Sequence, residues 1–387
     1  MEGFTAMKRL PLLLLLLWPT LCCTACDDPQ GGGTPGDFVF VSAGGLHACA
    51  LDREGRLWCW GLGGNGQLGV GELLQTDDAI PVYGDNRYVD VCTNYVHSCA
   101  IDVAGVAWCW GENWEGQLGI TSQDQQVVPA RVETTERFTR ISCGHDHTCA
   151  LGEAGDVWCW GFAGQSPLGQ VIRSQLPVRV DQMTGIAHIA GARQRLGVLT
   201  TEGIALELPR EDRCDNGFID NKIRGKASTG FPWEGLTLSH YCMGNSISCG
   251  LTLEGELFCL GGFMGYCTQC SKLPRRITAE TYTDLSCGEN TVCVIDTAGA
   301  ARCFGNNRLE NLCVGSSQEC LEVPRAVVGG HRFQQISTSL EFHCALEPEG
   351  SVWCWANHVF VPENQVNPVY NSAPTLVKRH PAYSFSN

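Results

Sequence analysis

The sequence has no cluster of basic residues and little of the composition that favours helices. Its 387 residues include 26 lysines and arginines against 41 aspartates and glutamates, a formal net charge of −15. A surface that binds duplex nucleic acid needs clustered Lys and Arg, so we expect no nucleic-acid partner. Forty-six glycines, with Asn, Asp and Pro, punctuate short apolar runs, and this pattern indicates an all-β chain.

Recognisable catalytic motifs are also missing. The sequence contains no P-loop, no H-E-x-x-H and no G-x-S-x-G. The stretch GLGGNG at 61–66 fits G-x-G-x-x-G by letter, but no helical pattern follows it, and fifty residues later the same place reads GENWEG. A Gly-rich connector explains this stretch better than a dinucleotide site. We therefore predict no enzymatic activity, no cofactor and no metal, although distant residues could still assemble an active site.

Cysteine, in contrast, is abundant. Twenty-four cysteines are unusual for a protein of a reducing cytosol. The N-terminus has the pattern of an exported chain, because Lys8 and Arg9 precede an apolar run at 10–21 that is too short for a stable membrane span. We predict a signal peptide at 1–25 and a flexible, Gly/Pro-rich tether at 26–37.

The end of the predicted signal peptide reads CTAC at 23–26. It resembles a bacterial lipoprotein signal, in which the cysteine after the cut, here Cys26, is lipidated. Cys23 departs from that pattern, which usually has leucine there, and ordinary cleavage after Ala25 is the alternative. We predict a lipid anchor on Cys26 as the only membrane contact, with the protein at the outer membrane or cell surface. Without the lipid, the chain would be periplasmic or secreted.

One fifteen-residue frame returns along the chain. HACALDREGRLWCWG (47–61) recurs as HSCAIDVAGVAWCWG (97–111) and HTCALGEAGDVWCWG (147–161). Repeat 4 is degenerate, because GARQRLGVLTTEGIALEL has lost the His, both Cys and both Trp, and an insertion at about 209–238 follows it. Seven repeats of about 50 residues fit the chain, anchored at Cys49, Cys99, Cys149, Gly197, Cys249, Cys293 and Cys344.

Each repeat has the composition of a propeller blade. It opens with a short apolar run that usually ends in Ser, as in FVFVSAG (38–44) and FTRISCG (138–144). The two cysteine-bearing strands, a Gly-rich connector and a Pro-x-x-Val element follow. Four short strands per repeat predict a β-propeller over 38–387, with seven blades, and a solenoid is the alternative.

The connectors carry a family resemblance. WCWGENWEGQLG (108–119) and WCWGLGGNGQLG (58–69), with AGGLHACAL (43–51) upstream, resemble the repeat of the regulator of chromosome condensation family, a seven-bladed propeller. That family's nuclear founder exchanges nucleotide on a small GTPase and binds chromatin, and a secreted bacterial propeller of this fold inhibits β-lactamase. An exported, acidic chain meets neither GTPase nor chromatin, so the resemblance implies only a binding scaffold.

The recurring glycine at Gly55 explains the spacing of the cysteines. A Gly at the third loop position suits a three-residue hairpin turn, since it adopts positive φ. The register then places Cys49 opposite Cys59, within disulfide range. A metal site would need a fourth ligand beside His47 and the two cysteines, so we prefer disulfides. Six pairs share this spacing: Cys49 and Cys59, Cys99 and Cys109, Cys149 and Cys159, Cys249 and Cys259, Cys293 and Cys303, and Cys344 and Cys354.

Other recurring residues have structural roles as their simplest explanation. We expect the repeated histidines His47, His97 and His147 to make buried hydrogen bonds to a neighbouring blade. The strand tryptophans, such as Trp58 and Trp60, should pack between blades. Five cysteines cannot be paired from the sequence: Cys92, Cys143, Cys214, Cys242 and Cys287.

We predict a non-enzymatic, monomeric binding scaffold whose face loops contact a protein or glycan at the envelope. The alternatives are an inhibitor of a secreted hydrolase and an enzyme with its site at the propeller channel. Binding hot spots are enriched in large side chains on loops held by a rigid scaffold. The rings could instead fold back over the blade edges. The candidate contact residues in the connectors are Trp114, Phe162, Phe263, Met264 and Tyr266.

Overall fold

The computed structural model describes residues 37–167, 170–207, 232–263, 270–307, 311–339, 342–356 and 373–380. These residues lie in one compact unit and form 26 strands without a helix, which confirms the all-β prediction. Within the same ranges there is accordingly no apolar helix of membrane-spanning length. The predicted signal peptide, Cys26, Cys214 and most of the 209–238 insertion fall outside them.

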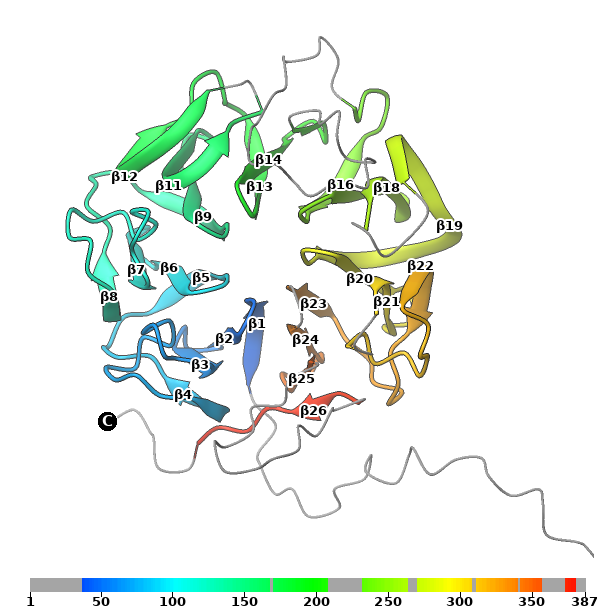
Figure 1. Ribbon diagram of the computed structural model, residues 1–387, viewed down its shortest axis with the longest axis horizontal. Coiled ribbons are helices and arrows are strands. Elements are labelled where there is room, and N and C mark those ends of the chain that lie inside the picture. The colour runs from blue at the N-terminus through cyan, green and yellow to red at the C-terminus, as the bar shows by residue number, and fades with distance from the viewer. Residues whose placement is uncertain are drawn as a thin grey trace, which may run out of the picture. The chain divides into compact units, whose positions relative to one another are not determined.

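The sheets stand in a ring around a central opening, and the first strand of each repeat lies nearest that opening (Figure 1). This arrangement is a β-propeller, as predicted. Three sheets have four strands and come from one repeat each. They are β1 (Phe38–Ala43), β2 (His47–Asp52), β3 (Leu57–Gly61) and β4 (Thr76–Pro81); β5 (Tyr88–Thr93), β6 (His97–Asp102), β7 (Ala107–Gly111) and β8 (Gln126–Arg131); and β23 (Gln335–Thr338), β24 (Phe342–Leu346), β25 (Val352–Ala356) and β26 (Thr375–Leu376).

The predicted count of seven blades is wrong, because the described strands form five sheets. Two sheets have seven strands, and each joins two consecutive repeats. One sheet is β9 (Phe138–Cys143), β10 (His147–Gly152), β11 (Val157–Gln165), β12 (Val171–Arg179), β13 (Ile186–Ala192), β14 (Arg195–Thr200) and β15 (Ala205–Leu206). The other is β16 (Leu238–Met243), β17 (Ile247–Thr252), β18 (Glu256–Gly262), β19 (Cys270–Cys287), β20 (Thr291–Asp296), β21 (Ala301–Asn306) and β22 (Cys320–Ala326).

Two local features join the repeats. Strand β19 runs for 18 residues without interruption, so it pairs with β18 of repeat 5 and with β20 of repeat 6. In the other large sheet, β11 and β14 meet in a parallel bridge between Gln165 and Arg195. Each connection joins the strands of two consecutive repeats into one sheet, while the seven sequence repeats remain.

The hairpin register is the predicted one. Cys49 lies opposite Cys59 and Ala50 opposite Trp58, and the turn residue Gly55 has φ of 74°. All six predicted within-repeat pairs are disulfides with Cα–Cα distances of 4.1 Å. The opposed cysteines therefore form disulfides while their residues keep the hydrogen-bonding register of the two strands. Most of these cysteines are completely buried.

The Gly-Gln-Leu-Gly connector supplies contacts between successive repeats. The buried indoles of Trp110 and Trp160 each donate Nε1–H to a carbonyl of the preceding repeat, at 2.9 Å in both cases. The acceptors are the backbone oxygens of Gln67 and Gln117. Trp60 is likewise 2 % exposed, so the predicted packing role of the strand tryptophans is confirmed.

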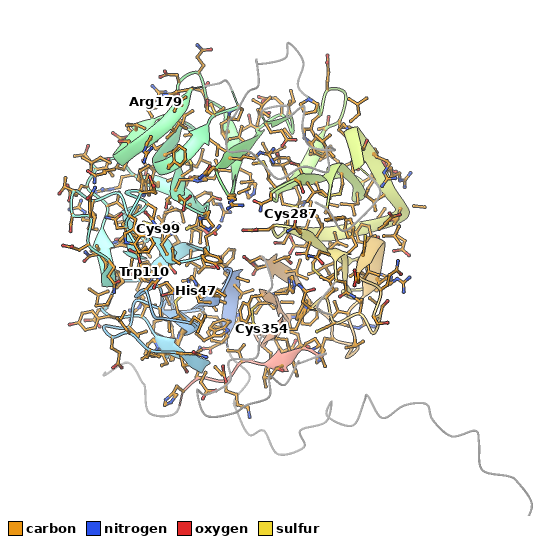
Figure 2. All side chains as sticks on the ribbon, in the orientation of Figure 1. His47, Cys99, Trp110, Arg179, Cys287 and Cys354 are labelled. Atoms are coloured by element: carbon orange, nitrogen blue, oxygen red, sulfur yellow. A yellow bond between two sulfur atoms is a disulfide. The ribbon has the colours of Figure 1, made fainter. Side chains whose placement is uncertain are left out.

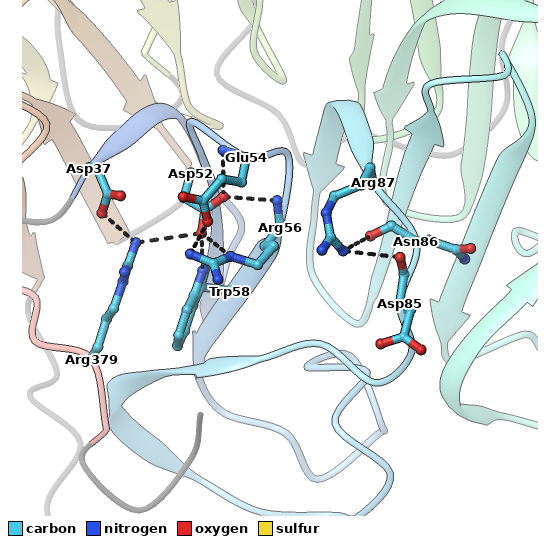
Figure 3. A network of polar contacts seen from close by, with 9 residues as sticks. All are labelled: Asp37, Asp52, Glu54, Arg56, Trp58, Asp85, Asn86, Arg87 and Arg379. Carbon is cyan, nitrogen blue, oxygen red and sulfur yellow. Dashed lines mark hydrogen bonds and ion pairs between the residues drawn. The ribbon is translucent and has the colours of Figure 1, made fainter. Parts of the chain in front are cut away.

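The C-terminal segment closes the ring onto repeat 1. Residues 378–380 bridge to β4 through the backbone of Ala79, which bonds Lys378 O at 2.7 Å. The neighbouring Arg379 places Nη2 2.8 Å from Asp37 Oδ1 and 3.6 Å from Asp52 Oδ2 (Figure 3). Its guanidinium also lies over the Trp58 ring, 4.4 Å from the centroid.

Candidate functional site

The first strands of the repeats enclose a cavity of about 660 Å³ at the centre of the ring. Because successive side chains of a strand point to opposite sides, only alternate residues can face this channel. The third and fifth residues of the opening run line it in repeats 1 to 6, and the fifth residue, Ser337, lines it in repeat 7. These two positions carry different chemistry.

The fifth position fastens each repeat to the next. Its serine Oγ or cysteine Sγ reaches the sixth residue of the following first strand, and six of the seven junctions have such a link. Figure 2 labels Cys287, the sixth-position partner in one of the disulfide links, at the wall of the central opening. The links are Ser42 Oγ with Thr93 N at 3.0 Å, Ser142 Oγ with Gly191 N at 2.9 Å, Ser286 Oγ with Thr338 N at 2.9 Å, Ser337 Oγ with Ala43 N at 2.8 Å, and the disulfides Cys92–Cys143 and Cys242–Cys287.

Repeat 4, which lacks the cysteine pair and has Ala190 at the fifth position, uses a buried ion pair instead. Arg195 Nη2 lies 2.9 Å from Oε2 of Glu207, whose side chain is fully buried. Glu207 also accepts hydrogen bonds from Trp233 Nε1 at 2.8 Å and from Ser248 Oγ of repeat 5 at 2.7 Å. The degenerate repeat is thus joined to its successor by charge-assisted hydrogen bonds.

The third position forms a second layer of the channel wall. Three of its side chains accept the backbone N–H of the fourth residue in the next first strand: Asp90 from Ile141 at 2.9 Å, Asp284 from Ile336 at 2.7 Å, and Gln335 from Val41 at 3.0 Å. A guanidinium has no acceptor and a phenyl ring has no polar atom, so Arg140 and Phe40 cannot make this bond. We did not predict this layer from the sequence. Its signal is the third residue of each opening run: Phe40, Asp90, Arg140, His188, His240, Asp284 and Gln335.

Desolvation shifts the titration of this layer. It raises the pKa of the Asp90 carboxyl to about 6 and also raises the pKa of Asp284. It lowers the pKa of His188 to about 4, and the nearby Arg140 and His240 act in the same direction. At pH 7, His188 is therefore neutral beside the permanently charged Arg140.

The recurring histidines of β2, β6 and β10 are fully buried, and desolvation lowers the pKa of each. Two make the predicted bonds to the next repeat: His47 Nε2 with Ser98 Oγ at 2.7 Å and His97 Nε2 with Thr148 Oγ1 at 3.0 Å. For His147 the prediction is wrong, since its ring has no partner among the described residues. Repeat 4 places Leu196 where repeats 2 and 3 have Ser98 and Thr148.

One group of sulfur atoms has the proximity of metal ligands. The Sγ atoms of Cys92, Cys99 and Cys143 lie within 4.8 Å of one another. Cys92 is bonded to Cys143 and Cys99 to Cys109. A disulfide sulfur offers no thiolate, so the group supports cross-linking rather than metal binding.

Among the predicted contact residues, Trp114 is 77 % exposed. Hydrogen bonds between the backbone and two neighbouring side chains fix the connector that carries Trp114. The side chain of Asn113 is buried and accepts Leu118 N–H at 2.9 Å, and Gln117 Oε1 accepts Glu115 N–H at 2.9 Å. The structure therefore presents a free indole on an ordered turn.

The other predicted contact residues differ from Trp114. Phe162 is half-buried, with the Arg173 guanidinium 5.0 Å from its ring centroid. Phe263 is only 7 % exposed and packs edge-on against Phe304, with centroids 5.7 Å apart, so its prediction as a contact residue is corrected. Packing against β21 stabilises it there. Met264 and Tyr266 lie outside the described residues.

Family models match the repeats of this chain. A model of the regulator of chromosome condensation (RCC1) repeat matches residues 104–151, and a second model of this repeat matches 38–67 and 138–165. These segments of the chain carry RCC1 repeats. The matched segments include the disulfide hairpins of repeats 1 and 3 and begin within that of repeat 2. No curated protein sequence matches the chain significantly.

Several solved structures share this architecture. Human WBSCR16 has a TM-score of 0.65 at 18 % identity, covering 79 % of this chain and 85 % of its own. The CRINKLY WD40 ectodomain of the Arabidopsis thaliana receptor kinase ACR4 has a TM-score of 0.54 at 15 % identity, with coverages of 84 % and 96 %. The ectodomain of the Physcomitrella patens receptor kinase CR4 has a TM-score of 0.51 at 16 % identity, with coverages of 86 % and 77 %. At these identities the likeness shows the fold alone.

Proposed function

We propose that this RCC1-repeat propeller is a non-enzymatic binding scaffold outside the cytoplasm, which presents connector loops to a protein or glycan. The observation that carries the proposal is Trp114, a large ring 77 % exposed on a turn held by Asn113 and Gln117. Exposed aromatic side chains on rigid loops are the usual energetic centres of binding surfaces. The cross-linked ring keeps such a loop in one position, which lowers the entropy cost of binding.

The disulfides support the proposed location outside the cytoplasm. Eight disulfides join described residues, six within repeats and two between them. Disulfides in such number persist in oxidising compartments. The similar plant structures are receptor-kinase ectodomains, which is consistent with the same environment.

We expect Trp114→Ala to weaken partner binding about 30-fold, as for a hot-spot residue, while changing the free energy of unfolding by less than about 1 kcal/mol. Repeat 1 has Gly64 at the equivalent place, so this turn folds without the ring. The measurement is quantitative mass spectrometry of material captured from envelope extract by the immobilised wild type and variant.

Val103→Ala is the matched control, since Val103 is 70 % exposed in the hairpin turn of the same repeat. Proteins lost with Trp114→Ala but kept with Val103→Ala would be specific partners. Equal capture by the wild type and both variants would rule out Trp114 as the contact.

The proposed location has a separate test. We expect labelled palmitate to be incorporated into the wild-type protein but not into Cys26→Ser, because lipidation forms a bond to that sulfur. The labelled wild type should fractionate with membranes and the variant with soluble protein. An unlabelled wild type in the culture medium would show a secreted protein without a lipid anchor.

A further inference from the structure

The third-position layer of the channel wall carries three basic side chains on consecutive repeats. Arg140, His188 and His240 are the third residues of β9, β13 and β16. All three line the central cavity of about 660 Å³, and that volume is typical of small-ligand sites. No other stretch of this layer has adjacent basic residues.

The acidic residues of the same layer are committed to the backbone. Asp90 accepts N–H groups of Ile141 and Val91, and Asp284 accepts that of Ile336. These bonds use the carboxylates to hold neighbouring strands. Asp90 is nevertheless the nearest acidic neighbour of Arg140, and Asp284 interacts electrostatically with His240.

Arg140 lines the channel and is largely exposed. Its Nη1 approaches Asp90 Oδ1 only to 4.0 Å, and 58 % of its side chain is exposed against 6 % for Asp90. That contact is longer than a charge-assisted hydrogen bond. The flat guanidinium is thus available for a planar, two-oxygen partner.

Two imidazoles line the cavity beside Arg140. His188 lies close enough to Arg140 and His240 for both to disfavour its protonation, and it makes a hydrogen bond with the backbone of Tyr241. His240 Nδ1 lies 3.0 Å from Ser239 Oγ. Because the Ser239 hydroxyl donates to the carbonyl of Thr252, it accepts from Nδ1–H, and Nε2 of the neutral ring is an acceptor that takes a proton when the ring is charged.

We propose that the central channel binds a carboxylate group of a ligand, with Arg140 as its ion-pair partner and the rings of His188 and His240 beside it. One cation suits a monoanion. Asp90 and Asp284 on either side would repel the second charge of a phosphate dianion. The carboxylate could belong to an acidic peptide or to a uronic acid, which share this chemistry. The site is independent of the connector surface around Trp114.

The test uses the whole folded protein and small probes. We expect acetate and glucuronate to bind with millimolar affinity and to shift the imidazole ¹H–¹³C signals of His188 and His240 in NMR titrations. Acetamide, which matches acetate without the charge, should shift neither ring, and inorganic phosphate should bind at least tenfold more weakly. A short amidated peptide with a single glutamate distinguishes the two sources: preference for it over glucuronate indicates a protein ligand, and the reverse indicates a glycan.

Variants assign the binding to the channel. Arg140→Gln should weaken acetate binding at least tenfold, and Arg140→Lys should retain part of the affinity. Arg173→Gln, an exposed arginine paired with Glu115 on the outer edge, should bind like wild type. Thermal unfolding checks each fold, and His240→Ala serves if Arg140→Gln does not fold. The proposal would be overturned by any of three results. These are wild-type affinity for acetate in the channel variant that folds, equal shifts of the imidazole signals with acetate and acetamide, and phosphate binding as tight as acetate binding. None of these outcomes depends on Trp114.

Discussion

Reduction of the disulfides is expected to unfold this protein at 25 °C. Each hairpin bridge closes a short loop, with a sequence separation of 10, and the chain-entropy model assigns it about 3 kcal/mol. Cys92–Cys143 and Cys242–Cys287 close longer loops, with separations of 51 and 45, worth about 4 kcal/mol each. Together the bridges exceed the usual folding margin of about 5–15 kcal/mol. Circular dichroism and tryptophan fluorescence with and without dithiothreitol measure the effect.

Paired cysteine variants separate the two kinds of bridge. The double variant Cys92→Ala with Cys143→Ala should lose about 1 kcal/mol more than Cys149→Ala with Cys159→Ala, because the longer loop constrains the unfolded chain more. Urea unfolding gives both values, and non-reducing peptide mapping should recover a Cys92–Cys143 peptide. A reduced protein that unfolds cooperatively at the same urea concentration as the oxidised one would contradict the stabilising role.

Glu207→Ala is expected to lower the free energy of unfolding by about 3–5 kcal/mol, since it leaves the buried charge of Arg195 without its carboxylate. The loss should concentrate at the junction of repeats 4 and 5, where Ser248 and Trp233 also lose an acceptor. Hydrogen exchange should therefore rise first in β14 and β17.

Glu115→Gln is the control for this variant. Its partner Arg173 is 65 % exposed, and surface ion pairs contribute little, so we expect a change below about 1 kcal/mol. Similar losses from Glu207→Ala and Glu115→Gln would show that the buried pair is not what joins these repeats.

The hairpins and their disulfides could be predicted from the sequence because they depend on residues close together in the chain. The glycine at Gly55 fixes the hairpin turn, and the turn fixes the register that opposes Cys49 and Cys59. The same reasoning applied to all six hairpins. The exposed position of Trp114 also followed from a connector between two strands. Phe263 did not follow, since its burial depends on Phe304, 41 residues away.

The sequence by itself determined the repeat, the all-β fold and the disulfide within each hairpin, because turn geometry and strand alternation act over a few residues. Only the tertiary structure decided the contacts between repeats. It paired Cys92 with Cys143, replaced the lost cysteines of repeat 4 by Arg195 and Glu207, and joined seven repeats into five sheets. It also brought the third residues of distant strands together in one channel. Such contacts depend on ring closure, which sets residues about fifty positions apart side by side and leaves no signature within any single repeat.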